Sequence, residues 1–192
     1  MLAVNFRPNT KLIENQLTCH LDKTIEVDEY LQTSMADVFA VGDLIRAPYA
    51  HTETDYYLPL VNHAYLSGKI AAMNLYQKTS AVPQSLRVTG SQFFGLYMVS
   101  VGLTEQEATL FYPIETTMLE KEISKENPSQ ITVKLITKKE TGQLIGAQVY
   151  SQSDILTLAD LLAISINAQM TDEALAFQDR LFYRGEFSMS EC

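Results

Sequence analysis

The first 80 residues combine short apolar runs with polar breaks and end in one longer helical pattern. Residues 24–28 alternate apolar and polar side chains, and residues 37–41 form a short apolar run that Gly42 ends. Both patterns predict strands, and the second predicts a buried one, because a strand buried on both faces is apolar throughout. Between residues 55 and 77, apolar residues recur at helical spacing, which predicts a helix there.

A polar stretch that contains a proline, residues 78–85, separates this half from the rest. Such stretches between periodic segments mark boundaries, so we predict two parts, residues 1–80 and residues 81–192. In the second part, aromatic and β-branched runs bounded by turn residues predict an antiparallel sheet. The expected strands are residues 93–101, 110–119, 131–137 and 144–150, the last two joined as a hairpin.

Three helices are also expected in the second part. Thr104 and Glu107 have the spacing of a capping box, in which each residue's side chain satisfies the other's backbone N–H. Residues 155–168 are apolar almost all round, and such a helix is buried in a core or at a subunit interface. Thr171 opens a final short helix that runs to Phe177. Strands and helices in this arrangement give an α+β fold.

Length, net charge and the absence of long apolar runs exclude several classes of function. The chain has 192 residues, enough for one domain or one and part of another. Its net charge of −9 opposes binding to nucleic acid or to an anionic membrane surface. No run approaches the ~20 apolar residues of a membrane-spanning helix, and the first residues do not resemble a signal peptide. We expect a cytoplasmic location with Cys19 and Cys192 reduced, and Cys19 buried as an ordinary core thiol.

Most self-contained catalytic motifs are absent from the sequence. None of the eight glycines stands in a Gly-x-Gly arrangement, so neither the dinucleotide fingerprint nor the phosphate-binding loop is present. The three histidines, His20, His51 and His63, lie outside any zinc-binding motif. There is no Gly-x-Ser-x-Gly nucleophile motif. We therefore expect no metal site and no catalytic residue that acts within this chain alone.

Several segments together carry a family resemblance. In the first half they are RPNT at residues 7–10, VDEYLQTS at 27–34, DVFAVGD at 37–43 and LPL at 58–60. In this order and spacing they resemble the FAD-dependent pyridine nucleotide–disulfide oxidoreductases, in the group of NADH oxidases, NADH peroxidases and coenzyme A-disulfide reductases. In the second half, residues 146–148, 151–154, 162–166 and 175–179 resemble the family's C-terminal dimerisation domain. The resemblance implies an incomplete C-terminal segment of an FAD-binding domain, residues 1–80, followed by that dimerisation domain.

The resemblance also implies which residues contact FAD. The family's aspartate after the glycine, which binds the ribityl or pyrophosphate region, corresponds to Asp43, and Gly42 permits the tight turn before it. The family's following helix directs its N-terminal amides at the flavin pyrimidine edge, which corresponds to Pro59, Leu60 and Val61. A helix N-terminus stabilises negative charge on reduced flavin. Since proline has no N–H, Leu60 and Val61 are the expected donors.

The same residues have structural explanations. An aspartate after a strand and a glycine is often a turn or helix-cap residue, and His63, where the family often has Asn, fits a core or surface histidine. The tyrosines near this region suit packing as well as a stacking surface; they are Tyr49, Tyr56, Tyr57 and Tyr65.

The sequence also departs from the family. Neither dinucleotide fingerprint is present, so the NADH site is missing, and no cysteine stands in the redox-active context. The end of the chain lacks the proline-tryptophan ending that oxidase and peroxidase members tend to have. Half an FAD site buries little of the cofactor, so we expect weak or no FAD binding, and no catalysis, by this chain alone. Without the Rossmann sheet, Val38, Phe39 and Val41 are expected to expose an apolar face.

Three functions follow from these observations. The first is the C-terminal portion of a flavin-dependent NADH oxidase or disulfide reductase, completing the FAD site and forming a homodimer. In that case a separate chain is one source of the missing Rossmann units. The second is a stand-alone dimerisation or interaction module that binds no flavin. The third is a truncated gene product without activity. The sequence does not identify the electron acceptor.

Overall fold

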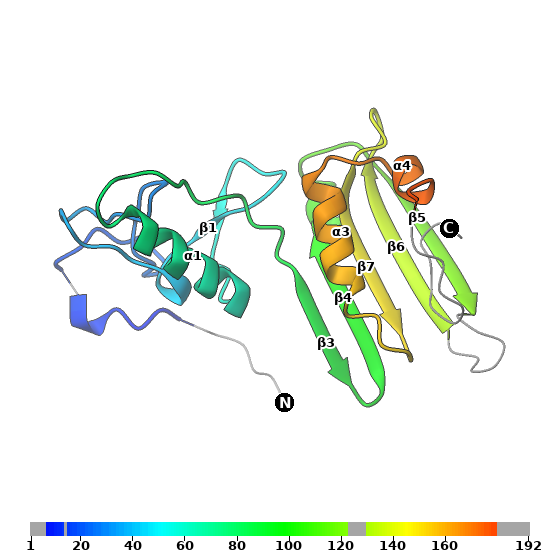
Figure 1. Cartoon of the computed structure of the whole chain (residues 1–192), viewed down its shortest axis with the longest axis horizontal. Coiled ribbons are helices and arrows are strands. Elements are labelled where there is room, and N and C mark those ends of the chain that lie inside the picture. Colours follow the sequence, from blue (N-terminus) through cyan, green and yellow to red (C-terminus); the bar gives the residue numbers. More distant parts are fainter. Residues whose placement is uncertain (1–6, 14, 123–129, 180–192) are drawn as a thin grey trace. The chain divides into compact units, whose positions relative to one another are not determined.

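The computed structural model describes residues 7–13, 15–122 and 130–179. It forms two compact units, Met1–Ser85 and Leu86–Cys192 (Figure 1). The division falls at the end of the polar stretch at residues 78–85. Within the described ranges, no helix is long and apolar enough to cross a membrane.

Unit 1 has few regular elements. They are η1 (Lys11–Ile13), η2 (Gly42–Leu44), β1 (Ala47–Pro48), β2 (Asp55–Tyr56) and α1 (Val61–Asn74). The prediction of strands at residues 24–28 and 37–41 is wrong. Ile25 makes only isolated bridges, to Cys19 and Ile45, and Phe39 makes one to Gln32. An apolar run becomes a strand only where a neighbouring strand of matching length pairs with it, and the described part of this unit offers none.

The apolar residues of these irregular segments are nevertheless partly buried. They pack with α1 in a core made of Ile25, Leu31, Ala40, Ile45, Ile70 and Ala71. Phe39 and Val41 pack against this core, and Val38 is also half-buried. The expected exposed apolar face is therefore not present. Cys19, by contrast, is exposed rather than buried. It forms an isolated bridge to Ile25 but is not part of the core.

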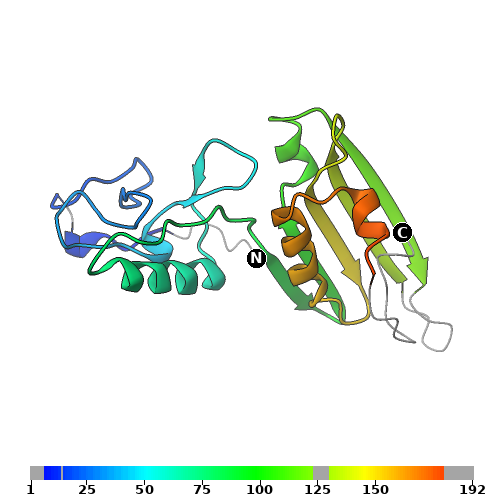
Figure 2. The same cartoon turned by 45° about the horizontal axis from the view of Figure 1, so that its top comes forward.

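Helix α1 is shorter than the predicted residues 55–77. Figure 2 shows it along one side of unit 1's irregular segments. It begins only after Pro59, since a proline restrains the residue before it to extended backbone, and Leu60 keeps that conformation. Its last residue is Asn74, whose side chain makes hydrogen bonds to backbone groups outside the helix. That side chain accepts from the N–H groups of Thr79 and Ser80 and donates to the carbonyls of Tyr30 and Ser80.

Unit 2 confirms the predicted α+β class. Five antiparallel strands pair in the order β3-β4-β7-β6-β5. They are β3 (Thr89–Phe93), β4 (Leu96–Gly102), β5 (Ile114–Glu122), β6 (Gln130–Lys138) and β7 (Leu144–Ser151). The predicted hairpin formed by residues 131–137 and 144–150 is confirmed as β6 and β7. The strand predicted at 110–119 begins later, at Ile114.

The strand predicted at residues 93–101 is in fact the second strand of a hairpin together with its turn. Phe94 and Gly95 form a two-residue turn with φ of 52° and 79°, flanked by the pair Phe93 and Leu96. Positive φ at both turn residues is the conformation that tight hairpins require. Aromatic residues continue through the turn, so composition alone did not reveal it.

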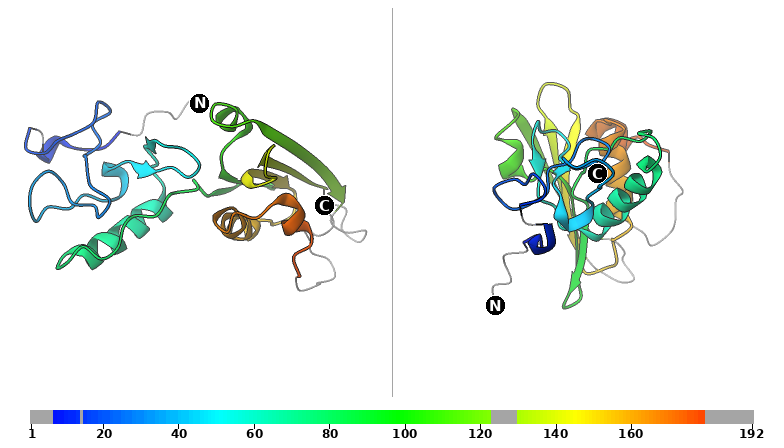
Figure 3. Two further views of the ribbon diagram at one scale, coloured as in Figure 1. Left: turned by 90° about the horizontal axis from the view of Figure 1, so that it is seen from above. Right: turned by 90° about the vertical axis from the view of Figure 1, so that its left-hand side faces the viewer.

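Three helices complete unit 2: α2 (Glu105–Ala108), α3 (Leu158–Asn167) and α4 (Asp172–Ala176). The predicted capping box of Thr104 and Glu107 is confirmed, as is the Thr171 cap that opens α4. Helices α3 and α4 cover the same face of the sheet (Figure 3). Helix α3 is not buried all round: Leu162 and Ile166 are buried, but 66% of Ile164 is exposed.

Candidate functional site

The structure brings η2 and the N-terminal part of α1 together in unit 1. Gly42 and Asp43 begin η2, and Pro59 and Leu60 immediately precede Val61, the first residue of α1. The two elements are separated by 16 or more residues of sequence but pack directly on each other. All five residues expected to contact a flavin therefore belong to, or directly precede, two elements that touch.

Gly42 makes this close approach. Its φ is +64°, and a Cβ placed on it would lie 3.3 Å from the Cβ of Ala64, so a side chain here is disfavoured both by backbone strain and by crowding. Its N–H donates to the Ser67 hydroxyl at 2.9 Å. Sequence analysis did not single out Ser67, because a serine inside a helical pattern carries no signal of a partner 25 residues away.

Asp43 presents an open carboxylate. The residue is exposed, and among the described residues no hydrogen bond or ion pair engages its side chain. Asp43 does not occupy the cap position of η2, which is Val41. An ionised carboxylate of this kind accepts strong hydrogen bonds from hydroxyl groups.

The start of α1 supplies donors. Pro59 has no N–H, and the Leu60 N–H donates to the Leu58 carbonyl at 2.8 Å. In the described part of the chain, the N–H groups of Val61 and Asn62 have no such partner, as expected at the first turn of a helix. Val61 was expected as a donor from the sequence. Asn62 was not, although every first helical turn leaves such groups free.

His63 is a core histidine. It is 6% exposed, and neither ring nitrogen has a hydrogen-bond partner among the described residues. Burial lowers the pKa of His63 below its ordinary 6.5, while the Asp43 carboxylate opposes that shift. Burial, together with the charges of Asp43 and Asp22, raises the pKa of Tyr57. Both effects show that Asp43 lies close enough to act electrostatically on two aromatic side chains.

The other tyrosines do not form one stacking surface. Tyr49 is buried and meets the edge of Tyr56, with ring centroids 4.9 Å apart. Tyr65, on α1, is 76% exposed. Core packing therefore accounts for Tyr49.

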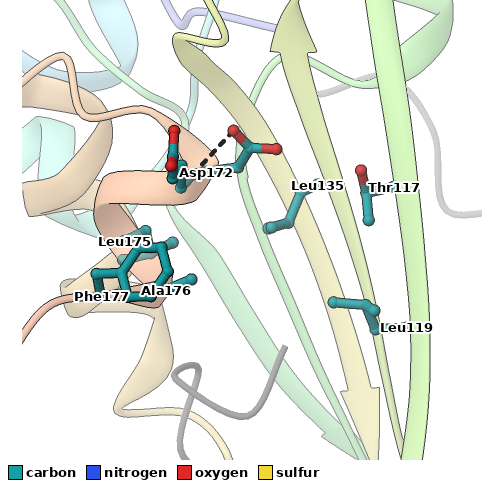
Figure 4. Close-up of a pocket in the computed structure, with 8 residues that line it drawn as sticks. Thr117, Leu119, Leu135, Asp172, Leu175, Ala176 and Phe177 are labelled. Carbon is teal, nitrogen blue, oxygen red and sulfur yellow. Dashed lines mark hydrogen bonds between the residues drawn. The ribbon is translucent and has the colours of Figure 1, made fainter.

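A cavity in unit 2 is lined mainly by apolar side chains. It has a volume of about 310 Å³ and lies between α4 and strands β5 and β6. Figure 4 shows apolar side chains that line it, such as Leu119, Leu135 and Phe177. Its acidic residues belong to the start of α4, where the Asp172 carboxylate accepts the Glu173 N–H. No group of three or more potential metal ligands occurs among the residues that the structure describes.

The residues at η2 and α1 fit part of a flavin dinucleotide. Gly42 lacks the Cβ that would crowd the contact between η2 and α1, Asp43 offers an acceptor for sugar or ribityl hydroxyls, and α1 offers backbone donors with its positive dipole end. No nucleophile or redox-active cysteine pair accompanies them in the described residues. The chemistry of this arrangement therefore suits contact with a cofactor.

The chain thus consists of a unit with few regular elements, which carries η2 and α1, followed by an antiparallel α+β unit. Comparison with family models gives the same division. Residues 1–68 match the pyridine nucleotide-disulphide oxidoreductase model, and residues 88–188 match the pyridine nucleotide-disulphide oxidoreductase dimerisation domain. The chain belongs to the pyridine nucleotide-disulphide oxidoreductase family, as its sequence motifs predicted, and FAD is that family's cofactor.

Individual relatives agree. An NADH oxidase of Enterococcus faecalis is 32% identical over 186 residues, covering 95% of this chain and 42% of the relative. A crystal structure of a pyridine nucleotide-disulfide family oxidoreductase from Enterococcus faecalis V583 superposes with a TM-score of 0.86 and 34% identity, over 97% of this chain and 44% of that one. The structure of the water-forming NADH oxidase of Lactobacillus brevis, bound to NADH, superposes with a TM-score of 0.87 and 26% identity. The match covers 96% of this chain and 42% of that one. The chain thus spans less than half the length of these relatives.

Proposed function

We propose that this chain supplies the flavin-contacting segment and the dimerisation domain of an NADH oxidase or disulfide reductase. The observation that supports the proposal most is the packing of η2, which contains Gly42 and Asp43, on α1, whose first turn has free N–H groups. The chemistry that FAD would supply in such an enzyme is the acceptance of hydride from a nicotinamide. The residues of this chain bind and orient the cofactor: Asp43 accepts hydrogen bonds from its hydroxyls, and Val61 and Asn62 donate to it.

The structure offers only one side of a cofactor site, so affinity for FAD is expected to be weak. Purified protein should carry no stoichiometric flavin, and a stoichiometrically yellow protein would show that this expectation is wrong. Weak binding is measurable by quenching of FAD fluorescence at high protein concentration. Asp43→Ala should weaken that binding by about tenfold, the order expected for a charge-assisted hydrogen bond.

The matched control is Glu53→Ala, which removes an exposed carboxylate of the same unit outside η2 and α1. It should leave FAD quenching unchanged, which separates a specific contact from a general effect of net charge. Equal quenching by the wild-type protein and by Asp43→Ala would overturn the proposal. It would favour the second function, a dimerisation module that binds no flavin.

We also propose that the chain forms a homodimer through unit 2. The support is the match to the family's dimerisation domain together with apolar side chains exposed on the helical layer. Ile164 of α3 is 66% exposed and Phe177, which follows α4, is 82% exposed. Apolar side chains exposed on one layer of a sheet domain are a common basis for association.

A further inference from the structure

Ser67 joins the two elements of the proposed flavin-contacting segment. It lies on the buried side of α1 and is 1% exposed. Its hydroxyl accepts the Gly42 N–H at 2.9 Å. On its own helix, the hydroxyl lies within donating distance of the His63 carbonyl at 2.8 Å and the Ala64 carbonyl at 3.1 Å. Donation to the preceding turn leaves a lone pair of the oxygen free to accept the Gly42 N–H. In the described residues, no other hydrogen bond joins η2 to α1.

Steric fit and hydrogen bonding act on the same loop residue here. The missing side chain of Gly42 allows η2 to approach Ala64, but close packing alone does not fix direction. The bond to Ser67 does, because an N–H donates well only along a narrow range of angles. Gly42 is buried, so without Ser67 its N–H would have no acceptor, which is costly inside a protein.

We propose that Ser67 is a positioning residue for the cofactor site. Its hydroxyl holds Gly42, and with it the neighbouring Asp43, in place against α1 before any cofactor is present. This inference rests on the proposed function, since it assigns Ser67 to the same site. Such preorganisation improves binding because the loop does not have to be ordered when the ligand arrives.

The test compares the wild-type chain with Ser67→Ala, using amide hydrogen exchange at residues 42–44. Loss of the hydroxyl should speed exchange at Gly42 by at least about tenfold, because the N–H loses its acceptor. A matched control exists in unit 2. Ser165 is 2% exposed on α3, and its hydroxyl donates to the Leu161 carbonyl at 2.9 Å, the same bond to the preceding turn. Ser165→Ala should leave exchange at Gly42 unchanged.

A second readout separates positioning from general stability. Ser67→Ala should weaken FAD quenching about as much as Asp43→Ala does, while Ser67→Thr, which keeps a hydroxyl, should restore slow exchange and quenching together. Unchanged exchange at Gly42 in Ser67→Ala would overturn the inference, whatever the flavin result. Faster exchange with undiminished quenching would also overturn it. Absence of quenching by the wild-type protein would instead overturn the proposed function, and the positioning role with it.

Discussion

His63 is the residue whose surroundings least suit its chemistry. An imidazole buried without hydrogen-bond partners is stable only when neutral, since a charge there would lose its hydration. The pKa of His63 is accordingly lowered by burial, against the pull of Asp43. The carbonyl of His63 accepts a hydrogen bond from the Ser67 hydroxyl. Protonation of the His63 side chain would therefore disturb the turn of α1 that holds η2.

We predict a pH-dependent stability of unit 1 that His63 controls. The unfolded chain takes up a proton near pH 6.5, whereas the folded chain does so only at lower pH. The stabilising contribution is therefore complete above pH 6.5 and is lost as the pH falls through the lowered folded value. Urea unfolding of the whole chain, followed through amides of unit 1 between pH 7.5 and 5, measures it. His63→Leu should flatten this dependence, and an identical slope in both proteins would contradict the assignment.

In unit 2, Glu107 is held by a hydrogen-bonded ion pair with Arg87. Its carboxylate accepts two bonds from Arg87, at 2.6 and 2.7 Å, and one from the Thr104 N–H at 2.8 Å. Burial by itself would raise the pKa of Glu107, but the bonds from Arg87 and Thr104 outweigh it and lower the pKa to about 2. This contribution is complete above pH 4.5 and is lost as the pH falls toward 2.

We expect Glu107→Gln to destabilise unit 2 by about 1–2 kcal/mol at pH 7, because it removes the charge of a hydrogen-bonded pair that solvent partly screens. Glu105→Gln is the comparison. Glu105 pairs with Lys134, but its side chain is 47% exposed, so its loss should cost under ~1 kcal/mol. Chemical denaturation of both variants gives the two values. Equal destabilisation by the two substitutions would mean that the ion pair of Glu107 with Arg87 stabilises unit 2 no more than the exposed pair of Glu105 with Lys134 does.

At the scale of elements, prediction succeeded where the signal was local. The cap of α4, the capping box of α2 and the β6–β7 hairpin all follow from residues a few positions apart. Prediction failed where the structure of a segment depends on residues far away in the sequence. Residues 37–41 have the composition of a buried strand, yet strand pairing depends on a neighbour. In the same way, Ser67 and Gly42 are 25 positions apart, so no local pattern predicts their hydrogen bond.

Helix α3 gives the prediction that belongs to this scale. If unit 2 associates through its helical layer, a charge at the exposed Ile164 should prevent it, because like charges would meet across a symmetric interface. Sedimentation of Ile164→Glu should give a monomer where the wild-type chain gives a dimer. Leu110→Glu, at another exposed apolar residue of unit 2, should remain dimeric. A wild-type mass that is monomeric at every concentration would exclude the homodimer.

At the scale of the whole molecule, the sequence predicted the family and both of its segments, because the motifs are spread along nearly the entire chain. It also placed Gly42, Asp43 and Val61 in the candidate site. It did not predict that Leu60 uses its own N–H locally or that Asn62 leaves one free. Those details depend on how the chain enters α1, which the motif does not encode.

The central claim is that η2 and the start of α1 contact the flavin side of FAD. The most direct measurement follows the backbone amides of the intact chain by NMR while riboflavin or AMP is added. We predict that riboflavin shifts the amides of Val61 and Asn62, and that AMP does not. Shifts with AMP alone, or no shift at these amides at millimolar riboflavin, would contradict the account.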